Sequence, residues 1–187
     1  MSGLPATGKS TIARALATEI RAVHLRVDVI EQAVVRAGAG EHPLGPAGYT
    51  IAYLLAEDFL RQGLMVVADS VNPLAITRQG WRDVASTAAV DYVDVEVVCS
   101  DRAEHERRAS TRVGDIPDLI LPTWSDISRR GYEPWDREHL IVDTARRGIA
   151  GCVTQVRSVV EPAPSRAPDW SVASHGWLCA RSALGEG

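Results

Sequence analysis

The sequence predicts an α/β protein in which a parallel sheet lies between two layers of helices. Short apolar segments typical of strands alternate along the chain with longer segments of helical periodicity, an order typical of parallel sheets that are covered on both faces. Asp28, Asp69 and Asp143 each stand just after such a strand segment. Ligands of these folds bind beyond the carboxyl ends of the strands, so the aspartates mark the expected site.

A phosphate-binding motif near the start of the chain narrows this prediction. The segment GLPATGKS, residues 3–10, satisfies G-x-x-x-x-G-K-[ST] at every fixed position. Gly3 and Gly8 let the backbone turn so that its N–H groups surround the phosphates of a nucleotide. Lys9 supplies positive charge to the same oxygens, Ser10 offers a hydroxyl to Mg²⁺, and the next helix directs its positive end at the phosphates.

Composition supports this interpretation, because Lys9 is the only lysine among 20 Lys and Arg residues. An ordinary glycine-rich turn before a helix is the alternative. We therefore predict a P-loop NTPase fold of three αβα layers that binds ATP. The ATP-binding residues would be Gly3, Leu4, Pro5, Ala6, Thr7, Gly8, Lys9, Ser10 and Thr11.

The strand that normally leads into such a loop is missing from the sequence. Only Met1 and Ser2 precede Gly3. Either the chain starts upstream of Met1 or the central strand is absent. We expect a truncated or misplaced start.

The first half of the chain continues with alternating elements. Ile12, Leu16 and Ile20 share one face of the helix expected over 11–20, and Gly63 is placed to end a later helix. Asn72 and the proline after it are typical of a helix N-cap and first helical position. The expected strands are 23–27 and 64–68, and the expected helices are 29–37, 49–62 and 73–89.

The second half follows the same order and carries two capping boxes. Asp101 with Glu104 starts a helix that runs to about residue 113, and Thr123 with Asp126 starts a short helix that ends near residue 130. The remaining strands are expected over 93–98 and 139–142, and the last helix over 149–160. We place a kinase domain at 1–160 and a weakly ordered tail at 161–187, where prolines are frequent and periodicity is lost.

Composition also excludes several classes. The net charge of −4 argues against a large non-specific nucleic-acid surface. Cys99, Cys152 and Cys179 are too far apart for a disulfide framework or a zinc site. No apolar segment reaches membrane-spanning length and no signal peptide is visible, so we expect a cytoplasmic protein.

Two aspartates are candidates for phosphoryl transfer, which requires a metal and a group that orients the acceptor hydroxyl. Asp28 is the candidate base, and a helix cap is the alternative role. Asp69 follows a buried strand and is expected to hold Mg²⁺ together with Ser10, with a cap or turn role as the alternative.

Several basic and aromatic side chains follow these aspartates along the chain. Arg108 and Arg112 are four residues apart, so we expect them on one helix face with the ATP phosphates between them. The alternative is a solvated basic face balanced by Glu104 and Glu106. Three aromatic residues either pack over the sheet or line an acceptor pocket: Trp124, Tyr132 and Trp135.

The run from Gly3 to about Asp143 resembles the small P-loop kinases related to chloramphenicol phosphotransferase, zeta toxins and polynucleotide kinases. The matching segments are GLPATGKST, the aspartate of LRVDVIEQ, ADSVNP with Arg78 downstream, and the Arg108–Arg112 pair. The resemblance implies that Asp28 activates the acceptor hydroxyl and that the two arginines clamp ATP. It also relates 69–73 to the D-x-[TV]-N motif of the polynucleotide-kinase branch.

One departure from that branch concerns the acceptor. Polynucleotide kinases carry an arginine three residues after the catalytic aspartate, where this chain has Glu31. The change favours an uncharged or cationic acceptor. We predict an ATP- and Mg²⁺-dependent kinase for a small-molecule hydroxyl. The alternatives are a polynucleotide or tRNA-end kinase, a P-loop ATPase or nucleotide switch without an acceptor, and an inactive module.

Overall fold

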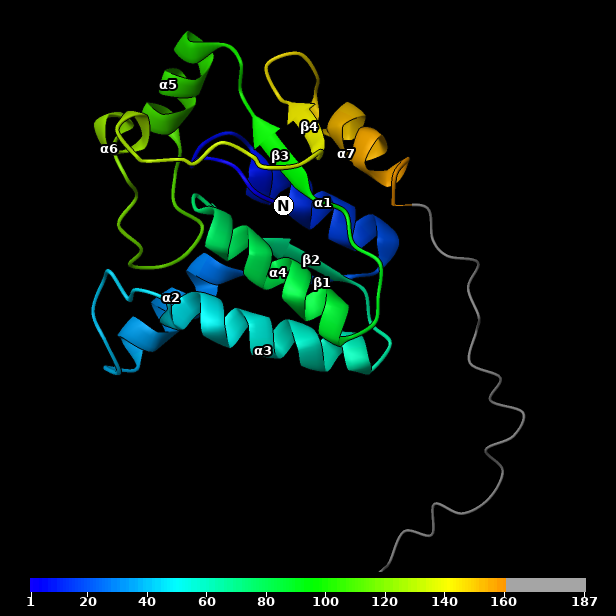
Figure 1. The fold of residues 1–187 in the computed structure, drawn as a ribbon. Helices are drawn as coiled ribbons and strands as arrows, with labels where there is room; N and C mark the ends of the chain where they lie inside the picture. Colours follow the sequence, from blue (N-terminus) through cyan, green and yellow to red (C-terminus); the bar gives the residue numbers. More distant parts are fainter. Residues whose placement is uncertain (161–187) are drawn as a thin grey trace, which may run out of the picture.

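The computed structural model describes residues 1–160, and the tail predicted over 161–187 lies outside the described residues. Helices and strands alternate as predicted (Figure 1). The elements are α1 (Lys9–Ile20), β1 (Val23–Arg26), α2 (Val27–Arg36), α3 (Ala47–Arg61), β2 (Val66–Asp69), α4 (Ala75–Thr87), β3 (Val95–Val98), α5 (Arg102–Thr111), α6 (Trp124–Ser128), β4 (Leu140–Asp143) and α7 (Ile149–Arg157).

The four strands form two parallel pairs, β1 with β2 and β3 with β4. The first residues of the chain join the pairs. Ser2 forms a parallel bridge to Glu96 and donates its backbone N–H to Val95 O at 2.7 Å, while Ser70 N–H donates to Met1 O at 3.3 Å on the other side. Met1 and Ser2 thus lie between β2 and β3 and join the two strand pairs. The predicted parallel α/β arrangement is confirmed.

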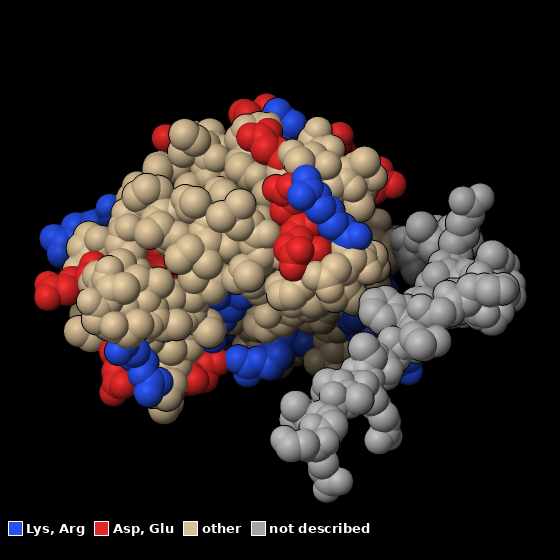
Figure 2. Space-filling view, turned by 90° about the horizontal axis from the view of Figure 1, so that it is seen from below, with Lys and Arg blue, Asp and Glu red and all other residues tan. Residues whose placement is uncertain are grey.

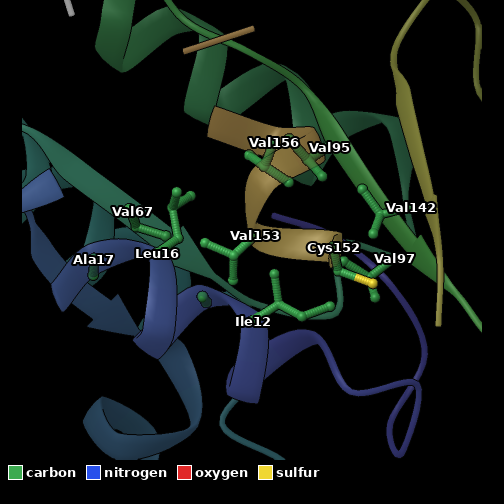
Figure 3. Close-up of a cluster of buried hydrophobic side chains, with 11 residues drawn as sticks. Ile12, Leu16, Ala17, Val67, Val95, Val97, Val142, Cys152, Val153 and Val156 are labelled. Carbon is green, nitrogen blue, oxygen red and sulfur yellow. The ribbon is translucent and has the colours of Figure 1, made fainter. Parts of the chain in front are cut away.

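Helices cover both faces of the strands. On one face, α1 and α7 pack over a cluster of buried side chains (Figure 3). On the other face, α3 and α4 pack over a second cluster that contains Leu25, Val27 and Val84. Burial of each large apolar side chain contributes roughly 1.5–3 kcal/mol to the stability of the fold. The two clusters therefore hold the helices against the strands and keep the strand ends in place. The first cluster includes Ile12, Leu16, Val67, Val95, Val97, Val142, Val153 and Val156.

Some predicted boundaries and caps were wrong. β1 ends at residue 26 instead of 27 and α2 begins at residue 27 instead of 29, so Asp28 follows the strand as expected but lies in the first turn of α2. The predicted Asn72 cap is absent, because α4 begins at Ala75 after Leu74. Asn72 has φ 49 and is buried, and it bonds Ser2 and Ser70 instead.

The two predicted capping boxes differ in outcome. Thr123 and Asp126 form the complete box that starts α6. Asp101 accepts the Glu104 N–H at 3.0 Å, as an N-cap does. The Glu104 carboxylate, however, binds Arg107 and Arg108 rather than returning to Asp101. A stronger charged partner therefore replaces half of the second box.

The surface over α2 and α3 carries few charges. Figure 2 shows that uncharged residues cover most of this side and that acidic and basic side chains form separate groups, one within the face and the others nearer its edges. Leu54, on α3, is 65% exposed. This face therefore offers no broad basic surface to nucleic-acid phosphates. No helix within residues 1–160 is long and apolar enough to cross a lipid bilayer.

An apolar cavity of about 710 Å³ lies between β2 and β3, at the ends of these strands that are remote from the phosphate loop. Leu16, Val66, Val95 and Val156 are among its lining residues. Its lining includes neither loop residues 3–10 nor Asp28, Asp69 or Arg108, so the cavity is separate from the predicted site.

Candidate functional site

The phosphate loop leads directly into α1. Gly3 and Gly8 have φ of 142° and 95°, in the region that favours glycine, so both motif glycines are required by the backbone. A Cβ on Gly3 would lie 2.3 Å from Val97 O, which leaves no room for a side chain. α1 begins after Gly8 with no side-chain cap, so its first N–H groups are available to an anion.

Two distant segments hold this loop from outside. The Thr144 hydroxyl donates to Thr7 O at 2.7 Å, and the His105 ring lies 2.8 Å from Pro5 O through Nε2. Thr144 follows β4, and His105 lies on α5. The loop is therefore fixed to both elements that flank its open side, and these two residues were not singled out by sequence reasoning as functional.

The fold brings Lys9 and Asp69 together, a pairing that the sequence analysis did not predict. Lys9 is 6% exposed and donates to Asp69 Oδ1, while His24 Nε2 lies 3.1 Å from Asp69 Oδ2. Asp69 is the last residue of β2 and is fully buried. Burial alone would raise the pKa of this carboxyl, but Lys9, His24 and Ser10 hold the pKa well below its usual range. Asp69 is therefore ionised.

Ser10 and Asp69 suit a magnesium ion. Ser10 follows Lys9, which pairs with Asp69, and the Ser10 side chain contributes to the lowered pKa of Asp69, so a hydroxyl and a carboxylate lie near each other beside the loop. No group of three or more His, Cys, Asp or Glu side chains that could hold a metal ion occurs in the described part of the chain. Mg²⁺ in nucleotide sites does not need one, because phosphate and water oxygens supply most of its ligands.

Asp28 lies at the same edge of the sheet and is accessible. Its side chain is 36% exposed, and its Oδ2 lies 3.6 Å from Arg26 Nε. α2 has no side-chain capping bond, so the alternative role of Asp28 as a cap is not observed. Glu31 follows one turn later, and burial and then Asp28 raise its pKa. Tyr49 closes this side, with its hydroxyl accepting Asn72 N–H at 3.1 Å.

The two candidate arginines diverge. Arg108 Nη1 donates to the Thr144 hydroxyl at 2.8 Å and lies 4.0 Å from where a Cβ on Gly8 would be, so it stands beside the phosphate loop. α5 ends at Thr111, and Arg112 has extended backbone angles. The expectation that both arginines share one helix face was therefore wrong.

Arg112 instead lies toward Asp28. It donates to Pro122 O at 3.2 Å, while its buried Nε has no hydrogen-bond partner among the described residues. Burial lowers the pKa of Arg112, and the nearby Asp28 carboxylate opposes this effect. The solvated basic face proposed as an alternative describes only Arg107, which is exposed and pairs with Glu104.

Sequence reasoning missed Arg26. Its Nη1 donates to both oxygens of Asp115 at 2.8 and 2.9 Å, and its Nε lies 3.9 Å from Asp69 Oδ2. Arg14 also binds Asp115. The available signal was a charged residue within the otherwise apolar strand before Asp28, but nothing in the sequence linked it to Asp115.

The segment related to the D-x-[TV]-N motif has a structural role. Arg78 is 1% exposed and donates to Asn72 O and to the backbone oxygens of 133 and 134. Its guanidinium carbon lies 4.7 Å from the Trp135 ring centroid, and Trp135 stacks on His139. The packing alternative thus accounts for Trp135 and for Tyr132, which also faces Arg78, while Trp124 packs against His105.

Comparisons with known proteins agree with this geometry. A family model described as AAA domain (AAA_33) matches residues 1–134, so the chain belongs to this family. It is 25% identical over 187 residues to an adenylyl-sulfate kinase of Synechococcus sp. (strain JA-3-3Ab), covering 95% of this chain and 94% of the relative.

Solved structures show the same fold. The Mycobacterium tuberculosis APS kinase CysC in complex with AMPPNP and APS superposes with a TM-score of 0.67 at 19% identity, over 86% of this chain and 94% of that chain. A gluconokinase from Sinorhizobium meliloti 1021 gives a TM-score of 0.60 at 16% identity, over 84% and 87%. The predicted α/β P-loop kinase fold is confirmed. The resemblance is confirmed at the level of small P-loop kinases, although these relatives bear the names of other kinases than the three to which the sequence motifs pointed.

Proposed function

We propose that this AAA_33 protein is an ATP- and Mg²⁺-dependent kinase that transfers the γ-phosphate of ATP to a hydroxyl of a small molecule. The observation that carries the proposal is the separation of two carboxylates at one edge of the sheet. Asp69 is buried against Lys9, where a nucleotide is expected, and Asp28 is accessible beside it. One carboxylate is suited to the metal and the other to an acceptor. The kinase names of the relatives support a phosphotransferase.

The residues of the loop would bind the nucleotide. The N–H groups at the start of α1 and the Lys9 ammonium would hold the phosphates, and Arg108 would neutralise charge that develops on them. Ser10 and Asp69 would hold Mg²⁺, which when bound neutralises phosphate oxygens. We place this kinase domain at residues 1–160.

Asp28 would act on the acceptor. Its carboxylate accepts the hydroxyl proton as the acceptor oxygen forms a bond to the γ-phosphorus, while the bond from that phosphorus to the bridging oxygen breaks and ADP leaves. Glu31 stands on the same side of α2 as Asp28, which disfavours an acceptor that carries a phosphate there. A small neutral or cationic alcohol therefore fits this side better than a polynucleotide end.

The test follows γ-labelled ATP in the presence of separate pools of aminoglycosides, phenicols, nucleosides, sugars and 5′-hydroxyl oligonucleotides. We expect one small-molecule pool to be labelled, and Asp28→Asn to reduce the rate by about 10²–10⁴-fold. Asp58→Asn, an exposed α3 carboxylate that accepts from Gln62, is the matched control and should keep the wild-type rate.

Other outcomes would decide against the proposal. Label in the oligonucleotide pool alone would indicate a polynucleotide kinase. Label released only as free phosphate, at a rate unchanged in Asp28→Asn, would indicate an ATPase or switch and would remove Asp28 from catalysis.

A further inference from the structure

Arg26 lies among three carboxylates that belong to different parts of the site. It is the last residue of β1, its side chain is 13% exposed, and it faces Asp28, Asp69 and Asp115. We propose that Arg26 is a positioning residue that couples the segment 112–123, which follows α5, to the acceptor base Asp28. This inference rests on the proposed kinase function.

The two ends of the guanidinium have different tasks. Nη1 chelates both carboxylate oxygens of Asp115 at 2.8 and 2.9 Å. Nε points the other way, 3.6 Å from Asp28 Oδ2, and is buried without a hydrogen-bond partner among the described residues. A planar guanidinium transmits the orientation fixed at one end to the other, which a flexible ammonium does not do. The position of Asp115 therefore determines where the positive charge beside Asp28 lies.

Asp115 is the more exposed partner in the ion pair with Arg26. Its side chain is 48% exposed, and it also binds Arg14 of α1, whose side chain is 59% exposed. Ion pairs at such exposure are individually weak and open readily. Arg26, by contrast, is held in place by burial at the end of the strand. In this ion pair, which we call the latch, Arg26 is therefore fixed on the sheet, and Asp115 on segment 112–123 can be released.

Arg112 belongs to the same segment as Asp115. It starts segment 112–123, three residues before Asp115, and its charge is attracted by Asp28 and repelled by Arg26. Asp115 compensates the charge of Arg26 and so reduces this repulsion. Release of Asp115 from Arg26 would therefore loosen the segment that carries Arg112 and would change the charge around Asp28 at the same time. Asp28 is therefore correctly placed as a base only when segment 112–123 is ordered.

The test compares Arg26→Lys, Arg26→Gln, Asp115→Asn and the double variant Arg26→Gln/Asp115→Asn in steady-state kinetics with the labelled acceptor. We expect Arg26→Gln to lower kcat about 10²-fold, because misplacement of a base by about 1 Å has effects of this size. Asp115→Asn should lower kcat by less and raise the KM for the acceptor. Arg26→Lys, which keeps the charge without the fork, should recover part of kcat.

The kcat of the double variant distinguishes a positioning role of Arg26 from a merely structural one. Because both residues act through one contact, we expect its kcat to match that of Arg26→Gln alone. Hydrogen exchange of segment 112–123 should be faster in Asp115→Asn and Arg26→Gln. Arg157→Gln is the control, because Arg157 joins α7 to Glu19 of α1 away from the site.

Three results would overturn the inference. These are kcat losses that multiply in the double variant, exchange of 112–123 that stays at the wild-type rate, and variants that lose thermal stability while kcat and KM are retained. In each case the wild-type kinase stands. If wild type labels no acceptor, the proposed function fails, and the coupling to the base fails with it.

Discussion

The substitution Lys9→Met tests the buried ion pair on which the site depends. Met keeps the length of the side chain and removes the charge that faces Asp69. The Lys9 side chain is 7% exposed and that of Asp69 is 0% exposed, so the variant leaves a carboxylate buried without its main partner. Loss of one partner from a buried pair costs about 3–5 kcal/mol. His24 and Arg26 remain near Asp69, which favours the lower end of this range.

The expected effect on stability is large enough to measure easily. About 3 kcal/mol is a substantial fraction of the 5–15 kcal/mol that stabilises a typical domain. For a domain of this size it corresponds to a fall in Tm of roughly 6–12 °C. Circular dichroism during thermal and urea unfolding, without nucleotide, measures it. Arg61→Met is the matched control, since Arg61 is 62% exposed in its pair with Glu57 and should contribute less than about 1 kcal/mol.

The double variant Lys9→Met/Asp69→Asn separates loss of the pair from general damage. It leaves neither charge of this buried pair, so it should be more stable than Lys9→Met alone. The pH dependence has a defined sign. The lowered pKa of Asp69 stabilises the wild type above the unfolded value of roughly 3.9, and this stability is lost as pH falls.

Without Lys9, burial favours the protonated carboxyl instead, so the gap between Lys9→Met and wild type should narrow toward pH 4. A Lys9→Met protein as stable as wild type at pH 7, with no gain in the double variant, would refute the reasoning. It would mean that Lys9 and Asp69 do not pair in the free protein.

Two further substitutions have defined outcomes. Gly3→Ala should destabilise the folded protein by at least about 2 kcal/mol, because backbone strain adds to a clash with Val97 O. Gly63 also has positive φ but lies in open space, so Gly63→Ala should cost less. Equal midpoints of urea unfolding for the two variants would contradict this prediction. Glu31→Gln should be more stable than wild type at pH 7 and equally stable near pH 4. The raised pKa of Glu31 means that its ionised form is disfavoured in the folded state, and this cost is lost as pH falls. A difference in stability that persists at pH 4 in urea unfolding would contradict this prediction.

The parts of the site that follow from local chemistry could be predicted from the sequence. The spacing of Gly3, Gly8, Lys9 and Ser10 has one backbone solution, and the structure adopts it. The apolar run before Asp69 correctly indicated a buried strand that ends there. These predictions depend on residues a few positions apart, where steric and hydrogen-bonding rules act directly.

The parts that failed depend on tertiary packing. Val27 joins α2, with its side chain 2% exposed in the second core cluster, and this moves Asp28 from the position before a helix into the first turn of that helix. Asn72 does not cap α4 because Ser2 and Ser70 satisfy its side chain. Local signals for strand end and cap were present at both positions, but burial was stronger.

Arg26 shows why long-range pairs escape sequence reasoning. Its partner Asp115 is 89 residues away in the chain, and neither residue lies in a recognisable motif. A charged residue at a strand end has many possible partners, and only the fold selects one. Residues that orient catalytic groups, rather than acting themselves, are therefore the hardest to identify from sequence.

Three cations of the site are already paired with carboxylates of the protein. Lys9 binds Asp69, Arg26 binds Asp115, and Arg108 binds Glu104. A nucleotide must therefore exchange partners with these groups rather than meet free charges. Such an exchange keeps Lys9 compensated at every stage, which matters because an unpaired buried charge is costly. The uncapped start of α1 needs no exchange and can receive a phosphate first. We infer that the helix end initiates nucleotide binding and that the side-chain cations complete it.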